Sequence, residues 1–483
     1  MNVRDLSPKE VWNYFEDLNA VPRPSKKEEK VIEFMRNFGE GLSLPTYVDA
    51  AGNVIVKKPA SKGMEDRKTV ILQSHLDMVH QKNAETDFDF LTQGIESYVD
   101  GDWVTAKGTT LGADNGMGVA TIMALLASDS ITHPPLEALF TIDEETGMTG
   151  AFELEKGILN GEILLNLDTE DDDEFSIGCA GGIDTNSIKN YSTCSIENGL
   201  AFEIIVKGLK GGHSGMDIHK GFGNANKFMS RLLYDGFDKF GLRVSKIDGG
   251  SLRNAIPRES KAIITIDKKK QSYFEDKLKK LITCINSEYA TLEPDLLITL
   301  KPCELPKSVM ELTKQENVIK ALRSIFNGVF RMSPDINNLV ETSNNLARVS
   351  IENGNILIGC LTRSSIDSSK FDLANCIKAT FELAGFNVKF SGEYPGWTPN
   401  MDSAILKILE KLYIKLNNSK PIVAACHAGL ECGILGKHYP EMEMISFGPN
   451  IKGAHSPDER VQISSVQKFW IFLKSILAEI PKK

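Results

Sequence analysis

Three absences in this sequence of 483 residues exclude whole classes of protein. No apolar run approaches the roughly 18 residues that a membrane-spanning helix requires, and the start, MNVRDLSPKEVWNYFEDL, lacks the apolar segment of a secretory signal. The eight cysteines are scattered without a disulfide framework, which is typical of reduced thiols in the cytosol. We therefore expect a cytoplasmic protein that does not act at a membrane.

Clusters of positive charge are also scarce. The chain has 55 Lys and Arg residues against 65 Asp and Glu residues, which gives a formal net charge of −10. Phosphate binding needs clustered Lys and Arg, so we expect no nucleic-acid partner. The 41% hydrophobic and 25% charged residues are ordinary for a globular chain, and the length indicates roughly two to three domains.

The order of strand-like and helix-like segments predicts an α/β architecture. The apolar runs KTVILQSHLD, LEALFTID and EILLNLD read as strands, and GVATIMALLAS, between the first two, reads as a helix. Such alternation predicts a mostly parallel sheet, in which sites form beyond the carboxyl ends of the strands. Polar residues stand at these ends.

The pattern changes in the middle of the chain. Between residues 188 and 393, alternating strand pairs such as LAFEIIVKGLKGG are mixed with long amphipathic helices, in two loosely similar halves. This pattern predicts an inserted α+β domain of the lid or dimerisation type and suggests an internal duplication. We expect the insert to divide a catalytic α/β domain into residues 1–187 and residues 394–483.

Clusters of His, Asp and Glu lie at predicted strand ends or in loops. They are His75 and Asp77 in SHLDMV, Asp114 in TLGADNGMG, Glu144 and Glu145 in DEETG, Asp168 in LNLDTED, and His455 in GAHSPDE. Each residue alone is more often a cap or loop residue than a ligand. Together they form a mixed nitrogen and oxygen donor set, which suits zinc.

In two of these clusters, the spacing of the residues suggests how their side chains point. On an extended segment His75 and Asp77 face the same side, so Asp77 can accept the second N–H of a metal-bound imidazole. The alternative is an exposed polar pair that ends a buried strand. Glu144 and Glu145 are adjacent, and on a strand they would point to opposite faces. They form either a solvated loop or a pair of acids with two different tasks.

The motifs, taken in order, resemble the M20 family of co-catalytic zinc peptidases and, within it, the aminoacyl-histidine dipeptidase branch, also called cytosol non-specific dipeptidases. The segments that carry the resemblance span nearly the whole chain and are SHLDMV, GTTLGADNGMG, DEETGMTGA, GGHSGMDIHKGFGNANK, HAGLECG and FGPNIKGAHSPDERV. The resemblance implies a homodimer and two zinc ions per subunit, for which manganese or cobalt can substitute.

The resemblance also assigns roles to residues of the first and last parts of the chain. It implies that His75 and Asp168 hold one zinc ion, that Glu145 and His455 hold the other, and that Asp114 bridges both. Glu144 would be the general base that takes a proton from the attacking water and passes it to the leaving amine. The two adjacent glutamates would then have separate tasks, because a ligand carboxylate is a poor base.

Residues of the insert would complete the site. The resemblance implies that His213 donates a hydrogen bond to the tetrahedral oxyanion, and that Asn254 and Arg363 help to bind the oxyanion and the carboxyl end of the substrate. In HAGLECG, Gly429 and Glu431 are candidates for substrate contact, although a capping and packing loop would have the same composition.

The predicted function is hydrolysis of short unblocked peptides such as Xaa-His. An N-acyl-amino-acid deacylase or a tripeptidase of the same family would share the ligands and the base, so the ligands alone do not separate these activities. The long insert and HAGLECG favour the dipeptidase. A catalytically silent metal-binding scaffold is the third hypothesis, and the presence of Glu144 and of every predicted ligand weighs against it.

Overall fold

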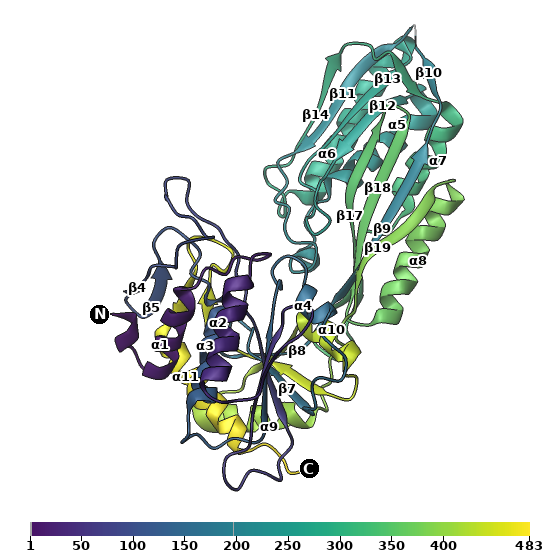
Figure 1. The fold of residues 1–483 in the computed structure, drawn as a ribbon. Coiled ribbons are helices and arrows are strands. Elements are labelled where there is room, and N and C mark those ends of the chain that lie inside the picture. The colour runs from purple at the N-terminus through teal and green to yellow at the C-terminus, as the bar shows by residue number, and fades with distance from the viewer. Residues whose placement is uncertain (1, 197) are drawn as a thin grey trace. The chain divides into compact units, whose positions relative to one another are not determined.

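The computed structural model describes residues 2–196 and 198–483, which fold as two compact units (Figure 1). Unit 1 contains the chain up to Gly178 together with Pro399–Ala425 and Leu430–Lys483, and unit 2 contains Cys179–Thr398 and Cys426–Gly429. The boundaries expected from the sequence, 187/188 and 393/394, fall inside two strands of unit 2. No turn marks the start of unit 2 in the sequence, because its first strand begins only two residues after the last strand of the preceding segment ends.

Unit 1 is built on a mixed sheet. Its strands, in spatial order, are β1 (Thr46–Val48), β2 (Val54–Lys58), β6 (Leu136–Thr141), β3 (Val70–His75), β7 (Ile163–Asn166), β21 (Glu443–Ser446), β8 (Glu174–Cys179) and β20 (Ile422–Cys426). The central strands β6, β3, β7 and β21 pair in parallel, whereas β1 and β2 pair antiparallel at one edge. Strands β3, β6 and β7 are buried along their whole length, which explains their apolar runs 70–72, 138–140 and 163–165.

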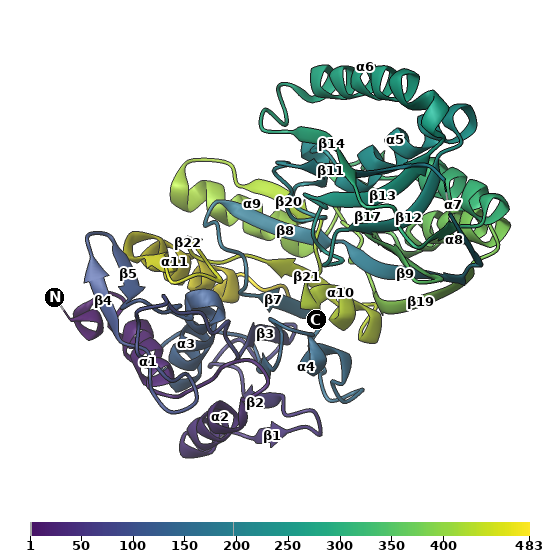
Figure 2. The same ribbon diagram turned by 90° about the horizontal axis from the view of Figure 1, so that it is seen from above.

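Helices pack against this sheet and link its strands. They are α1 (Lys9–Asn19), α2 (Glu29–Gly41), α3 (Ala113–Ala127), α4 (Thr149–Phe152), α9 (Ala404–Asn417), α10 (Glu431–His438) and α11 (Ile463–Ala478). Helix α2 contacts β1 and β2, α3 contacts β3, and α9 contacts β21 (Figure 2). A small antiparallel sheet accompanies them, with the order β22 (Ile451–Lys452), β23 (Arg460–Gln462), β5 (Trp103–Ala106) and β4 (Ser97–Asp100).

Unit 2 is built on one long antiparallel sheet. Its strands, in spatial order, are β14 (Leu297–Cys303), β11 (Leu200–Lys207), β13 (Ser260–Ile266), β12 (Arg243–Gly249), β17 (Val340–Glu352), β18 (Asn355–Ser364), β9 (Gly181–Asn190) and β19 (Asn387–Tyr394), with β16 (Gly328–Met332) paired to β17. The pairing of β12 with β17 joins the two halves that the sequence suggested into a single sheet. Strands β10 (Thr193–Ser195) and β15 (Ser308–Met310) form a separate ribbon.

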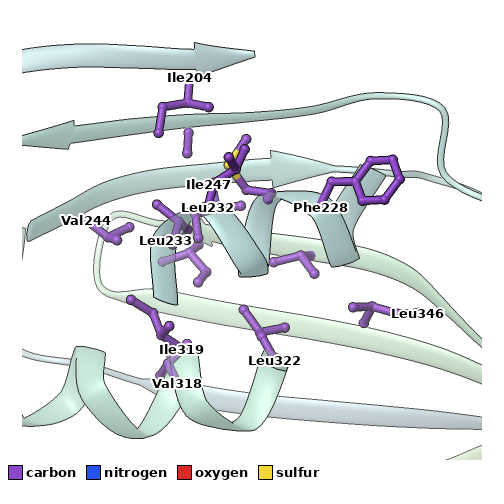
Figure 3. Close-up of a cluster of buried hydrophobic side chains, with 14 of the residues drawn as sticks. Ile204, Phe228, Leu232, Leu233, Val244, Ile247, Val318, Ile319, Leu322 and Leu346 are labelled. Carbon is purple, nitrogen blue, oxygen red and sulfur yellow. The ribbon is translucent and has the colours of Figure 1, made fainter. Parts of the chain in front are cut away.

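The core of unit 2 lies between this sheet and its helices. The helices are α5 (Ala225–Phe240), α6 (Gln271–Tyr289), α7 (Leu312–Ser324) and α8 (Asp367–Leu383). In Figure 3, Phe228, Leu232 and Leu233 of α5 lie among side chains from β11, β12, β17 and α7. The combination of antiparallel strand pairs and amphipathic helices is the α+β organisation that the sequence predicts for the insert. Within the described residues, every helix is too short or too polar to span a bilayer.

Candidate active site

Three of the predicted ligand segments follow neighbouring strands of unit 1. His75 is the last residue of β3, the Glu144–Glu145 pair follows β6, and Asp168 follows β7. Because β6, β3 and β7 are adjacent and parallel, their carboxyl ends lie at one edge of the sheet. This arrangement explains why segments that are far apart in the sequence supply side chains to one site.

Two further segments bring the remaining ligand residues to the same edge. Asp114 lies in the first turn of α3, and its backbone angles are not helical. His455 lies in the turn between β22 and β23 with φ 65°, a left-handed conformation that is uncommon for histidine. The structure therefore brings together all five residues that the sequence identified as metal ligands.

The two carboxylate oxygens of Asp114 face different partners. Asp114 Oδ1 lies 3.2 Å from His75 Nε2, and His75 Nε2 also lies 3.5 Å from Asp168 Oδ1. Asp114 Oδ2 lies 3.3 Å from His455 Nε2, which is 2.9 Å from Glu145 Oε2. The five side chains thus divide into a His75–Asp168 side and a Glu145–His455 side, with Asp114 between them.

The electrostatics of this cluster call for positive charge. Burial lowers the pKa of His75, but Asp168 and the hydrogen bonds to Asp114 and Asp168 outweigh it and raise that pKa well above its ordinary value. The hydrogen bonds to Asp114 and Glu145 raise the pKa of His455 to about 11. Both shifts have the same cause, which is that the carboxylates of the cluster stabilise positive charge beside them.

Divalent cations fit this donor set. Two imidazoles and three carboxylates are ligands that zinc accepts, and carboxylates that share a site repel one another unless a cation lies between them. Among the described residues, buried Glu145 Oε1 has no hydrogen-bond partner, although it belongs to the cluster. His75, Asp114 and Glu145 offer ligand atoms that all lie within 4.8 Å of one another.

Asp77 connects His75, a predicted ligand, to the glutamate pair. Its carbonyl oxygen lies 3.1 Å from His75 Nδ1, and its Oδ1 lies 3.4 Å from the same nitrogen. The Asp77 carboxylate also accepts the backbone N–H groups of Glu144, at 3.0 Å, and Glu145, at 3.3 Å. One fully buried side chain therefore orients both the imidazole and the turn that carries the two glutamates.

The glutamate pair lies in a turn and not on a strand. Strand β6 ends at Thr141, whereas the sequence suggested that it continues to Asp143. Asp143 has φ 56°, so the chain turns before Glu144. The alternation of side chains along a strand therefore does not separate Glu144 from Glu145, and the hydrogen bonds to Asp77 set their positions instead. Burial raises the pKa of the Glu144 carboxyl well above its ordinary value.

Unit 2 holds the second group of predicted residues. His213 lies in the loop after β11, and its Nδ1 accepts the backbone N–H groups of Gly215, at 3.3 Å, and Met216, at 3.0 Å. Burial and the nearby guanidinium of Arg363 lower the pKa of His213. A neutral imidazole whose Nδ1 accepts hydrogen bonds carries its proton on Nε2, so His213 presents an Nε2–H donor.

Arg363 lies in the same part of unit 2. It is buried near the end of β18, donates from Nη1 to Tyr394 Oη at 2.6 Å, and approaches Ser214 Oγ with Nε at 3.4 Å. Asn254 is linked to this loop because its carbonyl oxygen accepts the backbone N–H of Ser214 at 2.7 Å. Unit 2 thus groups His213, Asn254 and Arg363.

The HAGLECG segment is divided between the units. Gly429 belongs to unit 2, whereas Glu431 begins α10 of unit 1. Glu431 is buried and its Oε2 accepts hydrogen bonds from Gln73 Nε2 at 2.6 Å and Thr141 Oγ1 at 2.8 Å. Burial raises the pKa of Glu431 to about 8. Substrate contact by Gly429 or Glu431 stays a prediction.

Sequence reasoning missed several residues that support these groups. Glu459 accepts four backbone N–H groups from the segment that carries Asp114, Arg23 donates to the carbonyl oxygens of Leu76, Asp77 and Gly112, and Tyr394 holds Arg363. Glu459 lies inside the GAHSPDERV motif, four residues after His455, so the motif contained a signal for it. Arg23 and Tyr394 have no comparable sequence context.

The chain is similar to known peptidases over nearly its whole length. The model of peptidase family M20/M25/M40 matches residues 71–479. The cytosol non-specific dipeptidase of Escherichia coli K12 is 42% identical over 479 residues, which cover 99% of each chain. The crystal structure of the aminoacylhistidine dipeptidase from Vibrio alginolyticus has a TM-score of 0.95 and 43% identity and covers 100% of this chain and 99% of that chain. The structure of aminopeptidase PepT from Bacillus cereus, with 15% identity and a TM-score of 0.58 over 98% of this chain and 99% of its own, shares the fold.

Proposed function

The chain belongs to peptidase family M20/M25/M40 and is a hydrolase, and on that premise we propose that it is a metal-dependent dipeptidase for short unblocked peptides such as Xaa-His. The observation that carries the proposal is the arrangement of Asp114, whose two oxygens face His75 and His455 separately, together with the half-buried Glu144, which is not needed as a ligand. The names of the two similar dipeptidases support the choice of substrate class.

Two zinc ions fit the five donor residues. His75 and Asp168 would hold one ion, Glu145 and His455 the other, and Asp114 both. When bound, the ions supply Lewis acidity that polarises the scissile carbonyl group and acidifies water at the site. Manganese and cobalt are alternatives, because mixed nitrogen and oxygen donors accept all three metals.

Glu144 is the proposed general base. Burial raises the pKa of its carboxyl, which makes the carboxylate a stronger proton acceptor than an exposed glutamate. Glu144 takes a proton from the attacking water and gives it to the leaving amine. Asp77 fixes the backbone of the turn from which Glu144 acts, through the N–H groups of Glu144 and Glu145.

His213 is the proposed donor to the oxyanion. Its Nδ1 accepts two backbone hydrogen bonds, which leaves the proton on Nε2 for donation. A neutral donor of this kind stabilises negative charge that develops on the carbonyl oxygen. Asn254, which is linked to the same loop through Ser214, would assist it.

Arg363 is the proposed partner of the substrate's terminal carboxylate. A guanidinium binds a carboxylate through two parallel hydrogen bonds, and the bond to Tyr394 Oη fixes the plane of this one. We expect Arg363→Met to lower kcat/KM for a free dipeptide much more than for the same dipeptide with an amidated carboxyl end. Arg348→Met, which removes an arginine that pairs with Asp248 elsewhere in unit 2, is the control and should leave both values unchanged.

The test of the whole proposal is a set of four substrates. β-Alanyl-histidine, glycyl-histidine and their N-acetylated forms are incubated with the chelated protein, with and without added zinc. Cleavage of the free dipeptides alone, dependent on zinc, supports the dipeptidase. Cleavage of only the acetylated forms would make the protein a deacylase, and no cleavage despite bound metal would indicate a silent scaffold.

Homodimer formation and a cytosolic location complete the proposal. The resemblance implies a dimer, and β16 with its preceding loop exposes Phe326, Phe330 and Met332 on unit 2. Light scattering on the purified chain, compared with a Phe330→Asp variant, tests the dimer, because a charge in an apolar interface would dissociate it.

The similar Escherichia coli protein is named a cytosol dipeptidase, and cell fractionation tests that location for this chain.

A further inference from the structure

Four consecutive backbone N–H groups converge on the carboxylate of one buried residue, Glu459, which is 2% exposed. Its Oε2 accepts the N–H groups of Leu111 at 2.7 Å and Gly112 at 2.9 Å. Its Oε1 accepts the N–H groups of Ala113 at 2.7 Å and Asp114 at 3.1 Å. The last of these donors is the backbone of the residue that faces both sides of the metal cluster.

These four groups lie outside regular helix. Leu111 and Gly112 precede α3, and the backbone angles of Asp114 and Asn115 are not helical; Gly112 also has no side chain that could cap its neighbours. The carboxylate of Glu459 satisfies all four donors, which would otherwise be costly to bury. Because each oxygen of Glu459 accepts two N–H groups, the carboxylate fixes the backbone from Leu111 to Asp114.

Glu459 also belongs to the turn that carries His455. The backbone N–H of Ser456 donates to the carbonyl oxygen of Gly453, and the N–H of Glu459 donates to that of Ser456, both at 3.1 Å. The carbonyl oxygen of Glu459 accepts the hydroxyl of Thr105 at 2.8 Å. The backbone of Glu459 is therefore fixed to the His455 turn, while its side chain is fixed to the Asp114 segment.

The opposite side of the Asp114 segment is fixed independently. The buried Arg23 guanidinium donates to the carbonyl oxygen of Gly112 at 2.6 Å and to those of Leu76 at 3.1 Å and Asp77 at 3.2 Å. Arg23 thus ties the Asp114 segment to the strand end that carries His75. Glu459 ties the same segment to His455, so the two sides of the cluster have separate anchors.

We propose that Glu459 is a positioning residue that holds Asp114 Oδ2 and His455 Nε2 in place and thereby determines the affinity of the second metal ion, the one assigned to Glu145 and His455. This inference rests on the proposed two-ion centre. The first ion shares Asp114, but its other ligands, His75 and Asp168, are not held by Glu459, so we expect it to be affected less than the second ion. Glu459 itself contacts neither the substrate nor the ions.

The test is metal binding to the full chain after chelation. Glu459→Gln preserves the size of the side chain but replaces one acceptor oxygen with an NH2 group, which faces two N–H donors. We expect calorimetric titration with Mn²⁺ to give two ions per chain for the wild type. For the variant we expect the second site to weaken at least tenfold and the first site, which loses only the fixed position of Asp114, to weaken several times less. The electron paramagnetic resonance spectrum should change from a coupled ion pair to isolated ions.

Glu137→Gln is the matched control. Glu137 is a buried carboxylate of β6 in the same unit, it accepts the backbone N–H groups of Asn160 at 2.8 Å and Gly161 at 3.0 Å, and it is not a predicted ligand. We expect Glu459→Gln and Glu137→Gln to lower the melting temperature by similar amounts. Both metal sites should keep their wild-type affinity only in Glu137→Gln. If Glu459→Gln does not fold, Glu459→Asp replaces it, because the shorter carboxylate cannot reach all four donors, and the same selective loss is expected.

The failure of this inference differs from the failure of the proposed function. A wild-type chain that binds two ions, with unchanged binding in the folded Glu459 variant, would overturn the positioning role alone. Equal weakening of both sites would also overturn it, because the two anchors would not be separate. A wild-type chain that binds fewer than two ions would overturn the two-ion centre and, with it, this inference.

Discussion

The two units of the chain bury polar clusters of opposite character. The cluster in unit 1 gathers the carboxylates of Asp114, Glu145 and Asp168, whose charge raises the pKa of His75 and His455. The cluster in unit 2 gathers the guanidinium of Arg363 with His213 and His427, whose pKa values are lowered. The first cluster calls for cations, whereas the second offers N–H donors to an anion.

This difference shows that the proposed hydrolysis needs groups of two kinds. Metal ions and a base act on the attacking water, and hydrogen-bond donors are needed where negative charge develops or already exists. Ionised carboxylates cannot donate a hydrogen bond to an anion, and the positive charge of Arg363 disfavours a metal ion beside it. Each of the following predictions would sharpen this division or break it.

The largest effect is expected for the base in unit 1. Glu144→Gln removes the proton acceptor but no proposed ligand, so kcat should fall by about 10³-fold while the metal content stays the same. Steady-state kinetics and metal analysis measure the two quantities. The control is Glu153→Gln at the end of α4, an exposed glutamate of the same region, which should have wild-type activity. Loss of metal together with activity would instead make Glu144 a ligand.

Removal of metal should affect the two units unequally. Ions that are present at about 1,000 times their Kd stabilise the folded state by about 4 kcal/mol, and only unit 1 contains the predicted ligands. Chelation should therefore speed hydrogen exchange in α3 of unit 1 and leave α5 of unit 2 protected, as measured by mass spectrometry. An equal loss of protection in α5 would show that the ions do not act on unit 1 alone.

The next largest effect is expected for His213, the proposed oxyanion donor in unit 2. His213→Asn removes the proposed oxyanion donor and should lower kcat by about 10²-fold with little change in KM, because the bond strengthens only in the transition state. His219→Asn, which changes an exposed histidine of the same segment, is the control and should leave kcat unchanged. A change in KM alone would assign His213 to substrate binding.

The smallest effect concerns pH and buried His427. Burial, with help from Arg363 and His213, lowers the pKa of His427 to about 3. In the unfolded chain the pKa is about 6.5, so at intermediate pH the unfolded chain binds a proton that the folded chain does not. His427 therefore leaves the free energy of unfolding unchanged above pH 6.5 and lowers it as the pH falls. At pH 5 the decrease is about 2 kcal/mol.

His427→Gln should remove this dependence. Urea unfolding at pH 7 and pH 5 would give a smaller difference in the free energy of unfolding for the variant than for the wild type. The control His80→Gln, which changes an exposed histidine of unit 1, would behave as the wild type does. Equal pH dependence in His427→Gln and the wild type would mean that the loss of stability at low pH comes from protonation of carboxylates in unit 1 and not from protonation of His427.

The sequence by itself determined the family and the metal-ligand candidates. His75, Asp168 and the glutamate pair follow apolar runs that could be recognised as parallel strands, and the carboxyl ends of adjacent parallel strands share one edge. For the same reason the α/β class and the presence of an α+β insert could be predicted. These conclusions depend only on local patterns and on their order along the chain.

Only the tertiary structure decided how each group acts. Glu144 and Glu145 owe their positions to Asp77, Arg363 is held by Tyr394, and Asp114 is held by Glu459 across 345 residues of sequence. The protonated nitrogen of His213 follows from two backbone donors in a turn. Hydrogen bonds of this kind join residues whose proximity arises from folding, and no periodicity or composition in the chain encodes them.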